Sequence, residues 1–358
     1  MTELNKGRMA ACAALATILC LASAAAAKPH KPKHSPAPPD LSGGWSNLSG
    51  TDFERPERFK HLVLTPEEAA AYERLENDPD LIEKDAKAMR EKSGRPPSPD
   101  VGAIHVEYFE KVELLRVGGQ VHSSLLVAPE DGQLPYSNAG KAVMKAAHRR
   151  EMRDFSNPES RPVEERCILG SGEPLGPPLD TGPANANYVI VQTRDTIAIE
   201  GEMNHDVRLI RLNAPHGPPR IRPWMGDSTG VWQGDTLVVE TVNFNPGEGY
   251  QNTSGGMYVL SDQARVTEWF TRLSKTEILY RFSVDDPKTY TRPWAGEMVL
   301  KASSAPMLEF ACHEGNYSLR GILAGARKVE AEGKTPEPLD GGDPPPKPDA
   351  KAAAKAAS

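Results

Sequence analysis

Cysteine and long apolar segments are scarce in this sequence, and an excess of basic residues is absent. Of its 358 residues, 42 are lysine or arginine and 49 are aspartate or glutamate, which gives a formal net charge of −7. A chain with this acidic balance lacks the basic face that nucleic acid or an anionic membrane requires of its partner. Beyond the first 27 residues, no segment is apolar enough to span a membrane. We therefore expect neither a nucleic-acid partner nor a membrane span.

The N-terminus shows the three parts of a cleavable secretory signal peptide. Lys6 and Arg8 supply positive charge, Met9–Leu21 is an apolar run, and small residues occupy positions 22–27. The apolar run is shorter than the roughly 20 residues that a membrane-spanning helix needs. Signal peptidase cuts after small residues, so we expect residues 1–27 to be removed by cleavage after Ala27. The mature chain is predicted to be periplasmic or secreted, and the sequence leaves that choice open.

Only two cysteines are expected in the mature chain, because Cys12 and Cys20 leave with the signal peptide. The remaining two, Cys167 and Cys312, are predicted to form one disulfide in an oxidising compartment. Two unpaired thiols are the alternative, since the sequence does not show how far apart the residues lie. Catalysis by cysteine is not expected, because no Cys-x-x-Cys pair is present.

Polar segments flank a single predicted domain. Residues 28–40, rich in Pro, Lys and His, and residues 328–358, which end in Ala-Lys repeats, lack a core-forming pattern and are predicted to be disordered. Residues 41–327 are predicted to form one β-rich domain, with helical elements at about 65–92 and 141–155. The first helix is the clearest, because Thr65 and Glu68 fit a capping box and Pro66 occupies the first helical position.

The sequence of the second half of the domain predicts a series of short strands separated by tight turns. Ile278, Tyr280 and Phe282 alternate with polar residues, as in a strand that buries one face. Two-residue turns favour antiparallel neighbours, and closure removes exposed edges. The predicted fold class is therefore mainly β, an antiparallel meander forming a lipocalin-like barrel or a curled sheet, with N-terminal helical decoration. Strands are expected near residues 40–45, 105–115, 121–127, 188–193, 196–202, 207–212, 236–244, 265–273, 277–284, 295–301 and 307–312.

The sequence contains the residues of a serine-nucleophile motif, but the predicted elements around it are not the ones that such a motif needs. Residues 226–230 read Gly-Asp-Ser-Thr-Gly and so satisfy G-x-S-x-G. A nucleophile elbow needs a strand before the serine and a helix after it, whereas Pro223 precedes this string and another predicted strand follows it. We therefore do not expect Ser228 to be a nucleophile. Asp235 and the pair Asp285–Asp286 are interpreted as turn residues.

Two polar clusters resist a purely structural explanation. His205 and Asp206 open one predicted strand, and His313 and Glu314 follow directly after Cys312. If the strands share a barrel, both clusters are expected near one rim, where ligand sites often form. Neither cluster has the spacing of a metal motif such as H-E-x-x-H, so no metal and no cofactor are predicted.

Long strings of this sequence are similar to a widespread, uncharacterised family of secreted bacterial proteins, over about Asp40 to Arg327. The resemblance implies an exported, β-rich single domain and no particular activity. Members commonly carry a histidine where this chain has Arg265, which makes that position a poor catalytic candidate, whereas Glu268 agrees with the family pattern. The strings that carry the resemblance include Asp40-Leu41-Ser42-Gly43-Gly44-Trp45, residues 64–72, residues 224–239, which begin Trp-Met-Gly-Asp-Ser, and residues 311–317, Ala-Cys-His-Glu-Gly-Asn-Tyr.

Three functional hypotheses follow. The preferred one is an exported β-barrel that binds a small, apolar or aromatic ligand, with contacts from Arg208, Trp224, Asp227, Ser228, Trp232 and Asn316. The alternative is a periplasmic hydrolase, lyase or isomerase that uses acid–base chemistry at the barrel mouth, with candidates His205, Asp206, Glu268, His313 and Glu314. The third is a structural role in the cell envelope. The sequence leaves the oligomeric state open.

Overall fold

In a computed structural model of the chain we describe residues 37–78, 80, 81, 84, 112–169, 175–182, 186–247, 250–253 and 256–338. Residues from Pro38 onward form one compact unit. The predicted signal peptide lies outside the described residues. So do most of the leader at 28–40, most of the predicted helix that follows residue 80, and residues 339–358 of the predicted tail.

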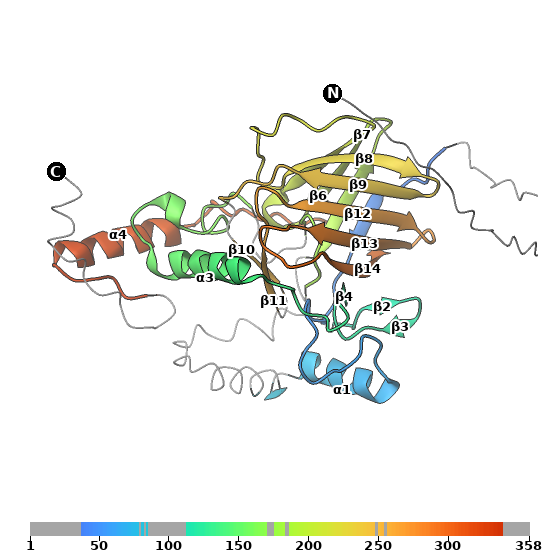
Figure 1. Cartoon of the computed structure of the whole chain (residues 1–358), viewed down its shortest axis with the longest axis horizontal. Coiled ribbons are helices and arrows are strands. Elements are labelled where there is room, and N and C mark those ends of the chain that lie inside the picture. The colour runs from blue at the N-terminus through green and yellow to red at the C-terminus, as the bar shows by residue number, and fades with distance from the viewer. Residues whose placement is uncertain are drawn as a thin grey trace, which may run out of the picture. The chain divides into compact units, whose positions relative to one another are not determined.

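The unit is built on a closed β-barrel (Figure 1). Nine strands follow one another around it in the order β1-β5-β6-β7-β8-β9-β12-β13-β14, β14 pairs again with β1, and the short strand β4 also pairs with β14. The strands are β1 (Gly43–Ser46), β4 (Leu126–Ala128), β5 (Asn187–Gln192), β6 (Thr196–Gly201), β7 (Val207–Leu212), β8 (Asp227–Gln233), β9 (Thr236–Val242), β12 (Arg265–Arg272), β13 (Glu277–Asp285) and β14 (Trp294–Ala302).

The predicted barrel is confirmed, and the purely antiparallel meander is wrong at one place. Strands β7 and β8 pair in parallel, with Ile210 opposite Ser228. A parallel pair requires the chain to cross back before the second strand begins, which takes about a dozen residues. Residues 213–226 make that crossing. The sheet is therefore mixed, although every other neighbouring pair in it is antiparallel.

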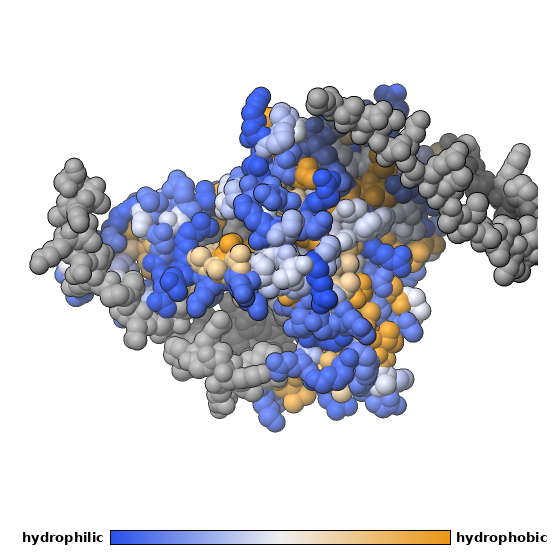
Figure 2. Space-filling view, viewed as in Figure 1, coloured by the Kyte–Doolittle hydropathy of each residue, from blue (hydrophilic) through white to orange (hydrophobic). Residues whose placement is uncertain are grey.

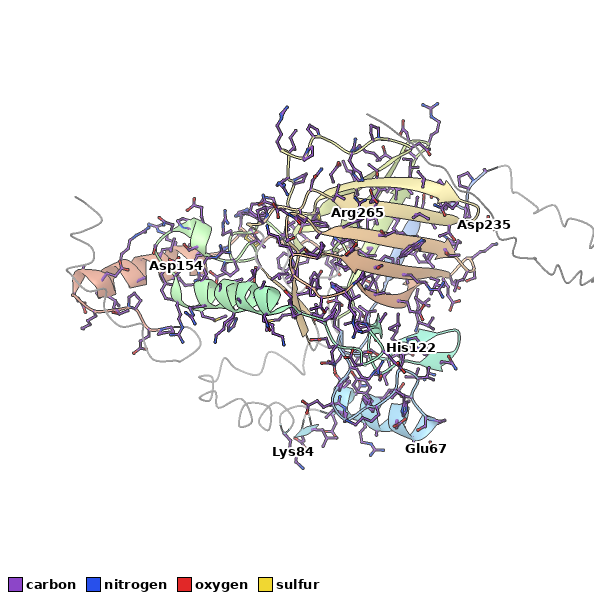
Figure 3. All side chains as sticks on the ribbon, viewed as in Figure 1. Glu67, Lys84, His122, Asp154, Asp235 and Arg265 are labelled. Atoms are coloured by element: carbon purple, nitrogen blue, oxygen red, sulfur yellow. A yellow bond between two sulfur atoms is a disulfide. The ribbon has the colours of Figure 1, made fainter. Side chains whose placement is uncertain are left out.

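Smaller elements surround the barrel. They are α1 (Pro66–Asn77), α3 (Asn138–Arg153), α4 (Ser318–Ala331), two single-turn 3-10 helices (Pro158–Ser160 and Met203–His205), and two short hairpins, β2 (Arg116–Val117) with β3 (Gln120–Val121) and β10 (Tyr250–Thr253) with β11 (Gly256–Val259). In Figure 3, Asp235 marks the turn between β8 and β9, and Arg265 marks the opposite end of this sheet region, at the start of β12.

Several elements differ from the sequence-based expectations: strand β8 was not expected, and residues 112–115, the described part of the strand expected at 105–115, are irregular. The strand expected at residues 307–312 does not form, so Cys312 and His313 do not follow a strand; they lie in an irregular segment before α4. Helix α4 was not predicted, and it extends past residue 328, where a disordered tail was expected to begin. By contrast, the predicted capping box of α1 is confirmed: the Thr65 hydroxyl accepts from the Glu68 amide at 3.2 Å, and the Glu68 carboxylate accepts from the Thr65 amide at 2.9 Å.

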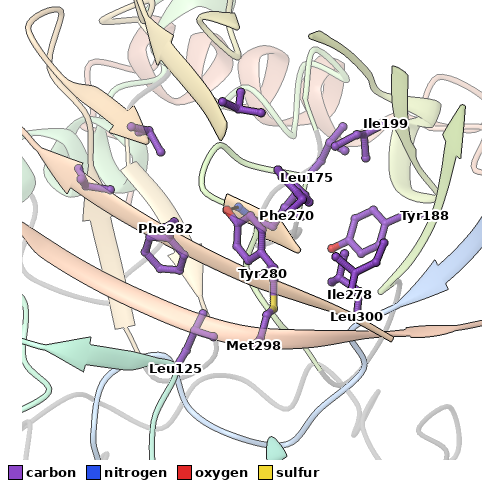
Figure 4. Packing of buried hydrophobic residues seen from close by; sticks show 14 of the residues in the cluster. Leu125, Leu175, Tyr188, Ile199, Phe270, Ile278, Tyr280, Phe282, Met298 and Leu300 are labelled. Carbon is purple, nitrogen blue, oxygen red and sulfur yellow. Dashed lines mark hydrogen bonds between the residues drawn. The ribbon is translucent and has the colours of Figure 1, made fainter. Parts of the chain in front are cut away.

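Large side chains fill the barrel interior (Figure 4). The alternation expected for β13 is confirmed, since Ile278, Tyr280, Phe282 and Val284 are all buried. Close packing explains one glycine here: a Cβ at Gly296 would lie 2.4 Å from the Phe282 ring. The inward faces of the other strands supply further buried residues, including Trp45, Tyr188, Ile190, Ile210, Leu237, Phe270, Trp294, Met298 and Leu300.

The first turn of helix α3 is bonded to the residues after β13, and its last turn accepts a hydrogen bond from Arg161 at the Glu151 carbonyl oxygen. Ser137 caps the helix, and both its amide and its hydroxyl donate to the carbonyl oxygen of Thr289, at 3.0 and 2.9 Å. Gly140 is the only buried residue of the helix, and a Cβ there would lie 2.0 Å from the same carbonyl oxygen. The remaining turns extend away from the barrel toward Asp154 (Figure 3). This attachment leaves one side of α3 facing a space beside the barrel.

Candidate functional site

Three of the predicted site residues meet inside the barrel. Arg208 of β7 forms a two-point ion pair with Glu268 of β12, and one of its two contacts measures 2.8 Å from Nη1 to Oε1. The same guanidinium donates to the hydroxyl oxygens of Ser228, at 3.1 Å, and Thr241, at 2.9 Å. The Tyr280 hydroxyl donates to Glu268 at 2.9 Å. Alternation along the strands turns all five side chains toward the interior.

This polar network is satisfied internally and closed to solvent. The Arg208 and Glu268 side chains are 2% and 0% exposed. Burial opposes the charged form of Arg208, but the adjacent Glu268 carboxylate outweighs that effect and raises the pKa of the guanidinium. Burial, reinforced by the same carboxylate, raises the pKa of Tyr280 well above its usual range. A charge pair held in this way is stable as an ion pair, and this environment favours a structural role for Ser228 and Glu268 over contact with a substrate.

No hydrogen bond or ion pair joins the two predicted histidine clusters in the described part of the chain. His205 belongs to a 3-10 turn between β6 and β7, and both it and Asn204 have positive φ angles, 51° and 56°. His313 lies in the segment between the barrel and α4, next to Cys312. Neither His205 nor His313 makes a hydrogen bond or an ion pair to the other cluster within the described part of the chain. The expected gathering of His205, Asp206, His313 and Glu314 at one rim is therefore not observed as a bonded set.

The predicted disulfide between Cys167 and Cys312 is present. It links residues 145 positions apart and holds the segment before α4 against residues 164–167. Asn316 reinforces this link, because its side-chain amide donates to the carbonyl oxygen of Glu165 at 3.1 Å. Asn316, a predicted ligand contact, thus links the segment after Cys312 to the backbone next to Cys167. Glu314 is exposed on the same segment.

The other predicted ligand contacts are dispersed. Trp224 lies in the crossing segment after β7, with the Arg166 guanidinium 5.9 Å from its ring centre. Trp232 packs against the barrel core, and its indole nitrogen is buried without a partner in the described structure. Asp227 begins β8 and accepts from Arg211 at 2.6 Å and from the Gly217 amide at 2.6 Å. These three residues do not line a common cavity among those described.

A histidine that the sequence analysis did not select ties the crossing segment to the barrel. The Nδ1 atom of His216 lies 3.2 Å from Asp227, and its Nε2 atom lies 3.0 Å from Glu240 and 3.3 Å from the Thr229 hydroxyl. Burial of Asp227 is outweighed by the hydrogen bond from Gly217 and by Arg211, so the pKa of that carboxyl is lowered. Two carboxylates therefore bracket one imidazole and tie the crossing segment to β8 and β9.

One concave site in the described structure lies beside α3, and we call it the α3 cavity. Its volume is about 550 Å³, which falls within the range of about 300–1,000 Å³ typical of small-molecule sites. Its walls are mainly apolar, and Figure 2 shows apolar side chains gathered over α3 within a largely hydrophilic part of this face. The apolar lining comes from Val143, Ala146 and Ala147 on one wall and Pro246, Val259 and Leu260 on the other.

Charged and polar side chains line the rest of the α3 cavity. Lys288 donates to Asp262 at 2.8 Å, and Arg222 lies 3.7 Å from the same carboxylate. The hydrogen bond from Lys288 is the main cause of the lowered pKa of Asp262. Arg150, on the last turn of α3, also lines the cavity and has no carboxylate partner within 4.0 Å among the described residues. Of the residues that line the cavity, Arg150 and Lys288 are cationic and Asp262 is anionic, while Asp154, which does not line it, interacts electrostatically with Arg150.

This arrangement suits a molecule with an apolar body and one acidic group. The apolar walls remove hydrocarbon from water, while Arg150 offers a planar guanidinium that matches a carboxylate.

No group of three or more His, Cys, Asp or Glu side chains in the described residues has a geometry suited to a metal ion. Among the described helices, none combines the length and apolarity needed to cross a membrane.

Comparisons with known proteins returned no match to a family model, to a curated protein or to a solved structure. The family resemblance stated above therefore stays a prediction.

Proposed function

We propose that this chain is an exported protein that binds a small amphipathic molecule, an apolar body carrying an acidic group, in the α3 cavity. The observation that carries the proposal is the combination of apolar walls, from α3 and from residues 246, 259 and 260, with the Arg150 guanidinium, which interacts with Asp154 but has no carboxylate within 4.0 Å among the described residues. The position beside the barrel follows from packing, because the barrel interior is occupied by the protein's own side chains. The barrel then acts as a rigid support for the α3 cavity.

Export is the second part of this proposal. Support comes from the predicted signal peptide at residues 1–27 and from the disulfide between Cys167 and Cys312, because disulfides persist in oxidising compartments such as the periplasm. We infer that the mature chain begins at Lys28 and that it belongs to the secreted bacterial family that it resembles. The acid–base enzyme hypothesis has less support, because Glu268 is sealed in the barrel and no hydrogen bond or ion pair joins the two histidine clusters in the described residues.

Calorimetric titration tests the proposed ligand class. Decanoate and 1-decanol share a chain and differ in the acidic group, so decanoate is expected to bind more tightly. Arg150→Ala is expected to weaken decanoate binding roughly 5- to 10-fold, the effect of losing one charge-assisted hydrogen bond, and to leave 1-decanol binding within about 2-fold. Lys145→Ala is the matched control, since Lys145 is an exposed cation of the same helix that does not line the cavity.

A second variant tests the role of the apolar walls of the α3 cavity. Val143 is 54% exposed and lines the cavity, so Val143→Glu brings a charge into it without disturbing the core. Binding of decanoate is expected to fall by at least about 10-fold, through loss of apolar contact and through repulsion. Equal affinity of the wild type and Val143→Glu for decanoate would place the ligand elsewhere and would contradict the proposal.

A further inference from the structure

A second cavity, separate from the α3 cavity, is bordered by arginines on two sides. It has a volume of about 460 Å³ and lies between α4 and the segment around Glu165 and Arg166. Arg320 and Arg327 line it from α4, and Arg166 lines it from the opposite wall. We call it the arginine cleft. Because its walls come from segments about 150 residues apart in the sequence, only the folded chain brings these three side chains together.

The helix presents two of the arginines on one face. Arg320, Leu323, Ala324 and Arg327 have the i, i+3, i+4, i+7 spacing that places side chains on one side of a helix, and all four line the cleft. Leu323 is buried, whereas both arginines are exposed. The face therefore combines an apolar middle with a guanidinium at each end.

The opposite wall is fixed by covalent and polar contacts. Arg166 precedes Cys167, which is bonded to Cys312, and the Arg166 guanidinium lies 5.9 Å from the centre of the Trp224 ring. The Asn316 side chain, which also lines the cleft, donates to the backbone of Glu165 at 3.1 Å. These contacts hold Arg166 opposite α4.

The charge of the cleft is not balanced by protein carboxylates. Glu165 is the only acidic residue that lines it among the described residues, and both of its oxygens accept from Arg161, at 2.8 and 2.7 Å. Arg166, Arg320 and Arg327 have no carboxylate within 4.0 Å in the described part of the chain. Three uncompensated guanidinium groups therefore border one cavity in a chain whose formal net charge is −7.

We propose that the arginine cleft binds a small organic phosphate. Guanidinium groups match the oxygen geometry of phosphate with paired hydrogen bonds, and several of them around one site favour a doubly charged group over a carboxylate. The cavity is larger than inorganic phosphate requires, and the exposed Ala324 and buried Leu323 offer apolar contact to the organic part. This site is independent of the α3 cavity and of the proposed function.

Phenyl phosphate titrated into the mature, disulfide-bonded protein tests this proposal, with calorimetry and tryptophan emission as two readouts. Saturable binding is expected, with phenyl phosphate at least about 10-fold tighter than benzoate. Arg320→Ala and Arg327→Ala are each expected to lower its affinity about 10-fold, the equivalent of 1.4 kcal/mol. Lys328→Ala is the matched control, because Lys328 is an exposed cation of α4 that does not line the cleft, and it is expected to stay within about 2-fold of the wild type.

Trp224 reports on the site itself. A phosphate that engages Arg166 is expected to change Trp224 emission, and Trp224→Phe is expected to remove this change while calorimetric affinity stays within about 3-fold.

Vesicles that contain phosphatidic acid test whether the phosphate belongs to a soluble ester or to a lipid headgroup. The proposal predicts that the protein does not co-sediment with them. Four results would overturn the proposal: no saturable binding, equal affinity for benzoate, equal losses in Arg320→Ala and Lys328→Ala, or co-sedimentation that Arg320→Ala abolishes.

Discussion

Arg208 and Glu268 lie on strands β7 and β12, which are not neighbours in the sheet, and their two-point ion pair crosses the interior of the closed barrel. Because both side chains are buried, each one is tolerated only in the presence of the other. The pair therefore couples two parts of the wall that share no backbone hydrogen bonds.

Removing one partner of this pair is expected to be costly. Glu268→Gln leaves the Arg208 charge buried without compensation and is predicted to lower the free energy of unfolding by about 3–5 kcal/mol. Replacing both residues by apolar side chains of similar size, Arg208→Met with Glu268→Leu, is predicted to cost much less than Glu268→Gln alone. Urea denaturation of the three proteins measures this, and a double variant less stable than the single one would contradict the interpretation.

Asp180 is expected to make stability depend on pH. Burial raises the pKa of its carboxyl to about 8, only partly offset by the Thr181 amide, and one carboxyl oxygen has no partner in the described structure. The folded state then keeps a proton that the unfolded state loses near pH 4, so stability falls as the pH rises from about 4 to about 8. The expected loss is on the order of a few kcal/mol.

Asp180→Asn removes this titration while preserving the shape of the side chain. The variant is predicted to be more stable than the wild type at pH 8 and to show a flatter dependence between pH 5 and pH 8 in urea denaturation. Asp195→Asn, in an exposed turn, serves as the control. Identical pH profiles for Asp180→Asn and the wild type would show that Asp180 does not titrate in this range.

The disulfide is predicted to contribute both to stability and to the arginine cleft. Closing a loop of 145 positions is worth about 5 kcal/mol in the chain-entropy model, and native disulfides typically contribute about 2–5 kcal/mol. The double variant Cys167→Ala with Cys312→Ala is therefore expected to unfold at lower urea. Under conditions where the variant stays folded, it is expected to bind phenyl phosphate more weakly, because Arg166 loses its fixed position opposite α4. Unchanged stability and unchanged affinity would contradict both roles.

Gly140 is predicted to set the position of α3. A Cβ at this residue would lie 2.0 Å from the Thr289 carbonyl oxygen, so Gly140→Ala is expected to displace the helix, to lower stability by roughly 1–3 kcal/mol and to weaken decanoate binding. Gly325 of α4 is the matched control, since nothing lies within 4 Å of a Cβ there. Gly325→Ala is expected to stabilise the chain slightly, by up to about 1 kcal/mol. Thermal melts and calorimetry distinguish the two, and a neutral Gly140→Ala would contradict the prediction.

Much of the barrel could be predicted because its strands alternate clearly. The expected strand at 207–212 matches β7 at both ends, and the expected strands at 277–284 and 265–273 match β13 and β12 to within one residue. Strand β8 was missed because Gly226 and Gly230 gave it the composition of a turn. Gly230 in fact faces the core, where a Cβ would lie 3.0–3.2 Å from Ile210, Leu212 and Leu237. The requirement for a glycine there arises from packing between strands, which local sequence does not reveal.

The sites were harder to predict than the fold. Helix α4 was missed because Gly321 and Gly325 lower its helix propensity, although Leu319, Leu323 and Ala326 have helical spacing. With α4 unrecognised, Arg320 and Arg327 were assigned to no surface. Likewise, the charged residues around His216 are spread over residues 211–265 and meet only when the crossing segment folds onto β8 and β9. The predicted disulfide was the one signal that linked the two walls of the arginine cleft.

Native mass spectrometry of the protein purified from its export compartment, beside Val143→Glu prepared in the same way, tests the central claim most directly. We predict that the wild type begins at Lys28, lacks the two thiol hydrogens of Cys167 and Cys312, and carries a small molecule that gentle denaturation releases. Val143→Glu is predicted to have the same covalent mass and to carry none of that molecule. A wild type that is empty as purified and does not bind added decanoate, or equal occupancy of both proteins, would contradict the account.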